Sequence, residues 1–160
     1  MQVQFVRGAA PLSADVALAV LVFDGGVLSD AAKALDAASG GALTRAVAGG
    51  RFTGAKGQAL ELVAPASIAA GRVLLIGGGP RTEFNAQAAE AAAALAFQSS
   101  KNSGAKTLAL RLGDTAELAA QAAFGVTLAA YRFDRYRTTE KADKKPSVAT
   151  VIVESADADA

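Results

Sequence analysis

Residues Asp15 to Phe23 read DVALAVLVF, an almost unbroken apolar run rich in valine, and this run decides the fold of the chain. Because it is short and stops at Gly25-Gly26, it predicts a central β-strand whose two faces are both buried. It is also far shorter than the roughly 20 apolar residues that a membrane-spanning helix needs. The chain is therefore expected to fold around this strand in water.

Outward from this strand, extended and helical patterns alternate along the chain. Ser29 is placed to cap a helix that runs through Ala38. The other expected strands are Gln2 to Val6, Gln58 to Val63, Arg72 to Ile76, Thr107 to Leu112 and Ser147 to Glu154, and the other expected helices are Ala42 to Ala48, Phe84 to Ser100 and Asp114 to about Tyr131. This order predicts an α/β fold, a three-layer sandwich whose mixed, mostly parallel sheet has helices on both faces.

The longest expected helix, over Phe84 to Ser100, separates small apolar positions from polar ones. Its predicted inner face is Phe84, Ala88, Ala91, Ala92 and Leu95, and its predicted outer face is Gln87, Glu90, Gln98 and Lys101. Alanine on an inner face lets a helix approach a sheet closely and loses little side-chain entropy.

Composition limits both the size of the fold and the chemistry that it can hold. The 160 residues include 41 alanines and 16 glycines, 52% are hydrophobic, and the net charge is +1. These values predict one compact α/β domain over residues 1–154, and the small, acidic residues 155–160 are expected to form a frayed tail. The chain has no cysteine and no histidine, which excludes disulfides, thiol nucleophiles and histidine acid–base catalysis. The N-terminus lacks the features of a secretory signal, so a cytoplasmic location is expected.

Two glycine-containing turns are candidate binding sites. Ile76 to Pro80 (IGGGP) follows an expected central strand, where nucleotide-binding folds place a phosphate loop. It matches neither G-x-G-x-x-G nor the P-loop pattern, and a tight turn is the favoured interpretation. Phe23 to Gly26 (FDGG) places one carboxylate at the end of the central strand, and the favoured interpretation is again a turn.

Two basic stretches are further candidates. Arg51 to Gly57 (RFTGAKG) could contact an anion or another domain, or could simply connect two elements, and both interpretations stay open. Tyr131 to Arg137 (YRFDRYR) interleaves aromatic residues with arginine, and Arg132 to Lys145 holds six basic residues against three acidic ones. Such a stretch can bind nucleic acid. A helix end whose arginines complement the helix dipole is the favoured interpretation, because the whole chain has no broad excess of positive charge.

No complete catalytic apparatus is recognisable in this chain. It has no Ser/His/Asp set, no Cys/His pair and no convincing group of carboxylates. We therefore predict no catalytic, cofactor-binding or metal-ligating residue within it.

Read together, these stretches resemble the N-terminal domain of the leucyl (cytosol) aminopeptidase family. The resemblance rests on Val22-Phe23-Asp24, Leu28-Ser29, Phe52-x-Gly54-x-Lys56-Gly57, Val73 to Gly79 and Tyr131-x-Phe133-Asp134-x-Tyr136, followed by a lysine-rich linker. It covers essentially the whole chain, and the order and spacing of the motifs are more specific than any one of them. Residues 155–160 lie about where the interdomain linker of the family would begin, so the resemblance implies that they are the start of that linker.

The resemblance implies a macro-domain-like α/β sandwich that belongs to a two-domain metallo-exopeptidase. In the family, a C-terminal domain holds two divalent ions, such as zinc or manganese, and releases N-terminal residues such as leucine. The family signature Asn-Thr-Asp-Ala-Glu-Gly-Arg is absent here, and Phe23 to Gly26 is one residue short of the family's Phe-Asp-x-Gly-Gly metal motif. No catalytic residue is therefore carried over, and the 160-residue chain alone is expected to be inactive.

Three functional hypotheses follow. The first is a non-catalytic N-terminal domain that supports assembly and access to the active site. Its expected partners are its own C-terminal catalytic domain and further copies of the protein in a hexamer, and no membrane contact is expected. The second is a DNA-binding accessory role, suggested by Arg132 to Lys145. The third is macro-domain-like binding of ADP-ribose or a related nucleotide, suggested by the Gly77 to Gly79 turn.

Overall fold

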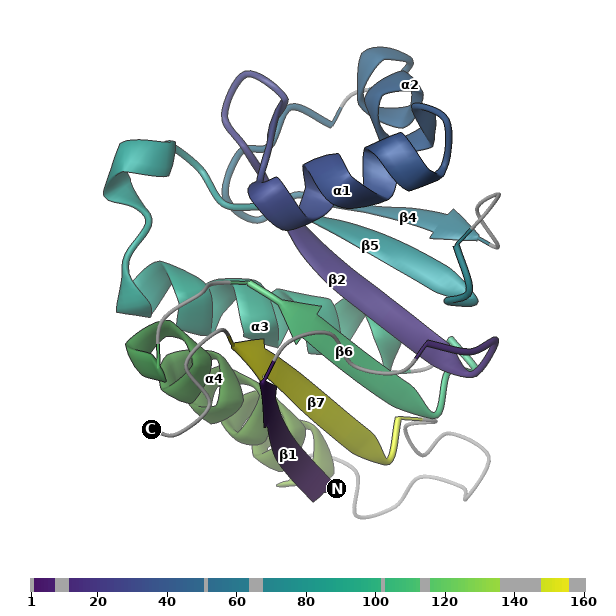
Figure 1. The fold of residues 1–160 in the computed structure, drawn as a ribbon. Coiled ribbons are helices and arrows are strands. Elements are labelled where there is room, and N and C mark those ends of the chain that lie inside the picture. Colours follow the sequence, from purple (N-terminus) through teal and green to yellow (C-terminus); the bar gives the residue numbers. More distant parts are fainter. Residues whose placement is uncertain are drawn as a thin grey trace.

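One sheet runs through the middle of the molecule, and strand β2 (Val16–Phe23) lies at its centre (Figure 1). The computed structural model describes residues 2–7, 12–50, 52–63, 68–101, 103–112, 116–135 and 148–155. Within these ranges the sheet has seven strands in the order β1-β7-β6-β2-β5-β4, with β3 paired to β2. The other strands are β1 (Gln2–Arg7), β3 (Val27–Leu28), β4 (Ala59–Val63), β5 (Arg72–Gly77), β6 (Thr107–Arg111) and β7 (Thr150–Ser155).

The sheet is mixed and mostly parallel, as the sequence predicts. Strands β1, β7, β6, β2 and β5 pair in parallel, whereas β4 and β3 pair antiparallel with β5 and β2. In the central register, Leu18 lies between Val73 of β5 and Ala109 of β6. The carboxyl ends of β2, β5 and β6 therefore meet at one edge of the sheet.

The apolar run that opened the sequence analysis is buried along its whole length. All eight residues of β2 are buried, and successive side chains enter two different cores. Ala17, Ala19 and Leu21 join the core on one face, and Leu18 and Val20 join the core on the other. The predicted central strand is thus confirmed.

Helices cover both faces of the sheet and complete three layers (Figure 1). The helices α1 (Asp30–Ala38) and α2 (Ala42–Ala48) lie on one face, and α3 (Ala86–Ser100) and α4 (Ala116–Arg135) lie on the other. Ser29 caps α1 as predicted, since its hydroxyl oxygen accepts a hydrogen bond from the Ala32 amide at 3.3 Å. No helix among the described residues is long and apolar enough to cross a membrane.

The predicted inner face of α3 is confirmed only in part, since Ala92 is buried and Phe84 and Leu95 pack against the same core, whereas Ala91 is exposed. The buried residues of α3 are Ala89, Ala92, Ala93, Ala96, Phe97 and Ser100. Of the predicted inner positions, Ala92 alone is buried, while Ala91 is exposed and Leu95 is half-buried. The physical reason is that α3 packs on α4 as well as on the sheet, with Gly125 of α4 lying against the Glu90 carbonyl. The buried side of α3 therefore includes the residues that face α4.

Other differences concern short elements and ends. Helix α4 continues to Arg135, four residues past its expected end, and its expected start at Asp114 lies outside the described residues. The strand β3 and the 3-10 helix η1 (Arg81–Glu83) were not predicted, because elements of two or three residues have no periodicity to detect. The expected start of the last strand at Ser147 also lies outside the described residues.

Candidate functional site

Three of the predicted candidate stretches meet at the carboxyl ends of β2 and β5. The Asp24 amide donates to the Gly79 carbonyl at 2.9 Å, and the Gly79 amide donates to the Gly54 carbonyl at 2.9 Å. The Gly26 amide donates to the Thr53 carbonyl at 3.0 Å. We call this meeting point, formed by residues 23–26, 53–57 and 76–79, the glycine junction.

The amides of the three consecutive glycines in the junction are hydrogen-bonded within the protein. The Gly77 amide donates to the Gln58 carbonyl at 2.8 Å, and the Gly78 amide donates to the Val22 carbonyl at 2.9 Å. With the Gly79 amide also bonded, all three amides of the candidate phosphate loop already have acceptors. An anion would have to break these bonds, so the structure favours the turn interpretation of this stretch.

Glycine is required in the junction because backbone segments touch there. A Cβ atom on Gly77 would overlap the Ala55 carbonyl oxygen, and one on Gly54 would overlap the Phe23 carbonyl oxygen. Gly54 also has φ +88°, a left-handed conformation that favours glycine. Close packing therefore requires glycine at Gly54 and Gly77, two of the positions in the candidate stretches.

The loop that enters the junction is held by Gln58, a residue that sequence reasoning missed. Its side-chain oxygen accepts hydrogen bonds from the Thr53 amide at 2.8 Å, the Thr53 hydroxyl at 3.1 Å and the Ala55 amide at 3.3 Å. Phe52 anchors the loop in the core on the α1/α2 side, while Arg51 lies outside the described residues. The loop thus connects two elements and closes the junction.

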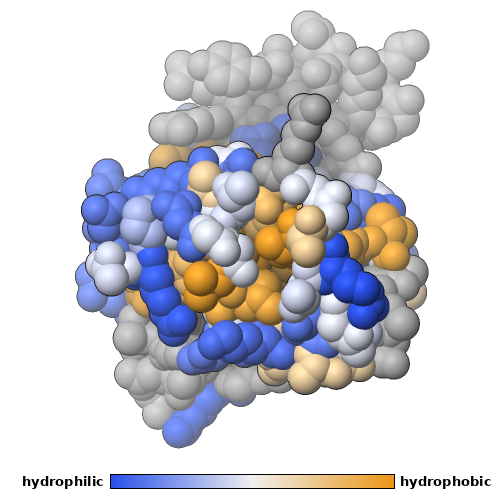
Figure 2. Space-filling model, turned by 90° about the horizontal axis from the view of Figure 1, so that it is seen from above, coloured by the Kyte–Doolittle hydropathy of each residue, from blue (hydrophilic) through white to orange (hydrophobic). Residues whose placement is uncertain are grey.

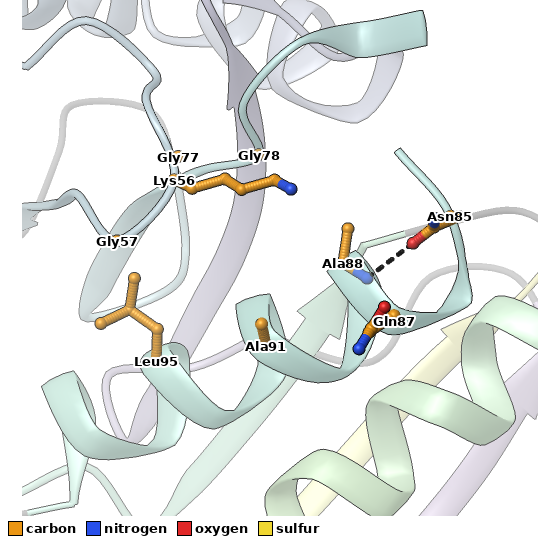
Figure 3. Close-up of a pocket in the computed structure, with 9 residues that line it drawn as sticks. All are labelled: Lys56, Gly57, Gly77, Gly78, Asn85, Gln87, Ala88, Ala91 and Leu95. Carbon is orange, nitrogen blue, oxygen red and sulfur yellow. Dashed lines mark hydrogen bonds between the residues drawn. The ribbon is translucent and has the colours of Figure 1, made fainter. Parts of the chain in front are cut away.

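A cavity of about 260 Å³ lies between the glycine junction and α3 (Figure 3). It is lined by Lys56, Gly57, Gly77, Gly78, Asn85, Gln87, Ala88, Ala91 and Leu95. Figure 3 shows the exposed Lys56 side chain extending toward the first turn of α3, where the Asn85 side chain accepts a hydrogen bond from the Ala88 amide at 2.9 Å. Among the described residues that line this cavity, the one charged group is the Lys56 ammonium.

A second cavity, of about 240 Å³, lies on the other side of β2, at the carboxyl ends of β2 and β6. We call it the β2–β6 cavity, and it is lined by Leu21, Phe23, Ser29, Asp30, Ala31, Arg81, Phe84, Arg111, Leu112 and Leu118. After β2 the chain continues on the β5 side and then crosses to β6 on the opposite side. Open α/β sheets bind ligands at such a reversal of strand order.

Two arginines of this cavity are positioned by neighbouring groups. The Arg111 Nε donates to both carboxylate oxygens of Glu154, at 2.9 and 2.6 Å, and the two side chains are only 18% and 6% exposed. The Arg81 guanidinium carbon lies 5.4 Å from the centre of the Phe23 ring, and that ring meets the Phe84 ring edge-on at 5.7 Å. None of these contacts was predicted from the sequence, because each joins residues of different elements.

The structure places no metal centre among the residues it describes. In those ranges there is no group of three Asp, Glu, His or Cys side chains that could hold a metal ion. Asp24, the carboxylate of the predicted FDGG turn, is exposed, and the buried Glu154 is paired with Arg111. The family resemblance implies divalent ions for a catalytic domain, and the described residues offer no group of side chains that could hold them here.

The basic stretch at the end of α4 can be placed only in part. Tyr131 is 62% exposed on α4. The side chains of residues 132–135, and all of residues 136–147, lie outside the described residues. Nucleic-acid binding by Arg132 to Lys145 stays a prediction.

Comparisons with known proteins agree on one family. The family model described as "Cytosol aminopeptidase family, N-terminal domain" matches residues 19–140. A probable cytosol aminopeptidase of Caulobacter vibrioides is 55% identical over 157 residues, which cover 98% of this chain and 32% of that protein. The chain thus spans about a third of the length of this curated relative.

Solved structures support the fold. A mutant of tomato leucine aminopeptidase superposes with a TM-score of 0.72 at 19% identity, covering 98% of this chain and 32% of that one. The macrodomain of Mycobacterium tuberculosis DarG superposes with a TM-score of 0.59 at 13% identity, covering 94% of this chain and 97% of that one. The predicted macro-domain-like α/β sandwich is confirmed by these likenesses.

Proposed function

The chain belongs to the cytosol aminopeptidase family, whose N-terminal domain it forms, and from this premise we propose that it is a non-catalytic domain supporting assembly and access to an active site. The activity then lies in a C-terminal domain, as in the two-domain enzymes of the family, and releases N-terminal residues such as leucine. Two divalent ions, zinc or manganese, would belong to that domain. A cytoplasmic hexamer is the assembly that the family resemblance supports.

The observation that carries this proposal is the closed glycine junction. Residues 23–26, 53–57 and 76–79 form backbone contacts that fix one end of the sheet, and the amides of Gly77, Gly78 and Gly79 are already bonded to carbonyls. The described residues also present no group of side chains for holding a metal. Such a domain supplies a rigid body and a surface, which suits a structural role beside a catalytic partner.

The side that carries α1 and α2 is the surface that we expect to contact the catalytic domain. Figure 2 looks down on this side and shows apolar atoms gathered near the middle between hydrophilic margins. Val27 of β3 is 44% exposed, and Leu28 and Val47 are only partly buried against the core beneath. Two short helices cover this face incompletely, and further burial would be gained from a partner.

The first experiment tests the isolated chain. Purified residues 1–160 are incubated with a leucyl anilide and added manganese, and release of leucine is measured. We expect no release above the buffer control, because the two-metal site lies elsewhere. Release of leucine by this chain at a rate proportional to its concentration would contradict the proposal.

A second experiment tests the supporting role. Residues 1–160 are joined to the remaining part of the Caulobacter vibrioides relative, and the joined protein is compared with that remaining part alone by light scattering and leucyl anilide hydrolysis. We expect the joined protein to form the larger assembly and to be more active, and Val27→Asp to weaken both effects. Equal size and activity with and without this chain would overturn the proposal.

A further inference from the structure

The β2–β6 cavity contains hydrogen-bonding groups that the fold itself does not use. Arg111 is held by Glu154 through its Nε alone, and among the described residues its terminal amino groups have no hydrogen-bond partner. A guanidinium held at Nε presents its two amino groups as a planar fork, which matches the two oxygens of a carboxylate. Arg81 adds a second cation at the same cavity.

A carboxylate lies at the rim of the same cavity. Asp30 is the first residue of α1, is exposed, and has no hydrogen-bond or ion-pair partner among the described residues. It is therefore available to an ammonium group. It also disfavours a ligand whose only charges are negative, such as inorganic phosphate, because like charges repel at short distance.

The walls between these charges are apolar. Leu21, Phe23 and Leu112 are buried, and Phe84 and Leu118 are half-buried. At about 240 Å³ the cavity is smaller than the range of about 300–1,000 Å³ that is usual for drug-sized ligands. It suits a small amphiphile better than a nucleotide.

We propose that the β2–β6 cavity binds a free α-amino acid with an apolar side chain. Its carboxylate pairs with the amino groups of Arg111 and with Arg81, its ammonium group pairs with Asp30, and its side chain lies against Phe23 and Phe84. A cation pair, a carboxylate and an apolar wall in one cavity match the three parts of such a molecule. The binding of an amino acid to this cavity does not depend on the proposed function. Only the identification of that amino acid as a product of peptide hydrolysis rests on the proposed function.

Isothermal titration of residues 1–160 with L-leucine tests the proposal. We expect saturable binding with a Kd of roughly 10 μM to 1 mM. Leucinamide, which lacks the carboxylate, and N-acetyl-leucine, which lacks the ammonium charge, should each bind at least about 10-fold more weakly, because each loses one charge-assisted contact. Inorganic phosphate and AMP should show no saturable binding at the same concentrations. Absence of leucine binding, or tighter binding of phosphate or AMP than of leucine, would overturn the proposal.

Variants locate the site without disturbing the core. Arg81→Gln and Asp30→Asn change exposed side chains, and each should weaken leucine binding about 10-fold while leaving thermal unfolding nearly unchanged. Lys56→Gln, in the cavity beside α3, and Asp24→Asn, outside both cavities, are matched controls that should bind leucine normally. Arg111→Gln removes the guanidinium that pairs with the buried Glu154, so leucine binding by that variant is compared only after its unfolding curve shows a folded protein. Equal weakening by Lys56→Gln and Arg81→Gln would place the ligand elsewhere and refute the assignment.

The two proposals fail in different ways. Leucine binding to residues 1–160 is measured without a catalytic domain, so it can succeed even if the assembly experiment fails. Conversely, a supporting role in the joined protein would survive a failed titration with leucine.

Discussion

The two sides of β2 differ sharply at its carboxyl end. Toward β5, the glycine junction is closed, and the amides of Gly77, Gly78 and Gly79 are all bonded to carbonyls. Toward β6, the cavity is open, and Arg111 keeps two amino groups without a partner among the described residues. In the sequence, the glycine-rich side offers candidate binding sites for which a turn is the favoured interpretation, whereas in the structure the arginine side has donors that face a cavity.

The difference shows that unused hydrogen-bonding capacity identifies a site better than glycine content does. Glycine permits both close backbone packing and close approach of a ligand, so a run of glycine does not distinguish between the two. A partly exposed arginine held at one nitrogen leaves its other donors facing a cavity, where the oxygens of a ligand can accept from them.

The largest loss of stability is expected for a variant that disrupts the glycine junction. Gly77→Ala would push a methyl group into the Ala55 carbonyl, so we expect at least about 3 kcal/mol loss of unfolding free energy in urea. Gly25→Ala is the matched control, since Gly25 has φ +83° but no atom lies within 4 Å of its added Cβ. That variant should lose only about 1 kcal/mol. Similar losses for both variants would show that strain, and not packing, governs the glycine junction.

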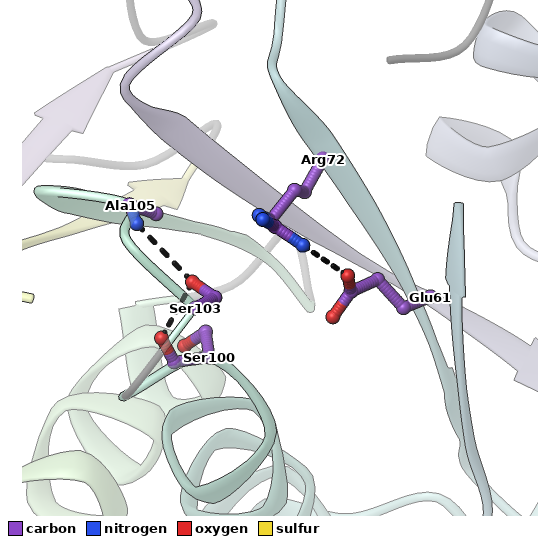
Figure 4. Close-up of polar contacts among 5 residues, drawn as sticks. All are labelled: Glu61, Arg72, Ser100, Ser103 and Ala105. Carbon is purple, nitrogen blue, oxygen red and sulfur yellow. Dashed lines mark hydrogen bonds and ion pairs between the residues drawn. The ribbon is translucent and has the colours of Figure 1, made fainter. Parts of the chain in front are cut away.

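A smaller loss of stability is expected for a variant beside the β2–β6 cavity. Glu154→Gln removes the charge that holds the 18% exposed Arg111, and we expect a loss of about 2–3 kcal/mol in the same urea assay. The matched control is Glu61→Gln at the edge of the sheet, where Glu61 pairs with Arg72 (Figure 4). Both of those side chains are about a third exposed, so this control should lose less than about 1 kcal/mol. If the two variants lost equal stability, Arg111 would not be held mainly by its buried partner.

The smallest effect on stability is expected near the carboxyl end of α1, at Asp36. The first residues of the same helix line the β2–β6 cavity. Burial raises the pKa of Asp36, but hydrogen bonds from the Thr44 hydroxyl and amide outweigh it, so the pKa lies below its ordinary value. A carboxylate with a lowered pKa stabilises the fold above its unfolded pKa of about 4, and this contribution is lost as the pH falls through the folded pKa.

Asp36→Asn should therefore lower the unfolding temperature slightly at pH 7, and the difference from the unchanged chain should shrink below about pH 4. Thermal unfolding followed by circular dichroism at several pH values measures this. Thr44→Ser keeps the hydroxyl that donates to Asp36 and should behave like the unchanged chain. A difference that is constant from pH 7 to about pH 3 would contradict the role of the Asp36 charge.

Much of the fold could be predicted from local patterns. The valine-rich strand, the Ser29 cap and the helix Ala42 to Ala48 each leave a signal within a few neighbouring residues. The inner face of α3 could not be predicted in the same way. A nearly uniform run of alanine has a weak amphipathic pattern, so the position of α4 decides which methyl groups are buried.

By itself, the sequence determined the order of the longer strands and helices, the central place of β2 and the turns after β2 and β5, because local periodicity and glycine report directly on local structure. Only the tertiary structure decided what meets at the carboxyl edge of the sheet. Arg111 and Glu154 are 43 residues apart in the chain, and they pair because β7 lies beside β6 in parallel register. Strand neighbours are chosen by packing over the whole sheet, so the open cavity beside β2 is a product of the fold.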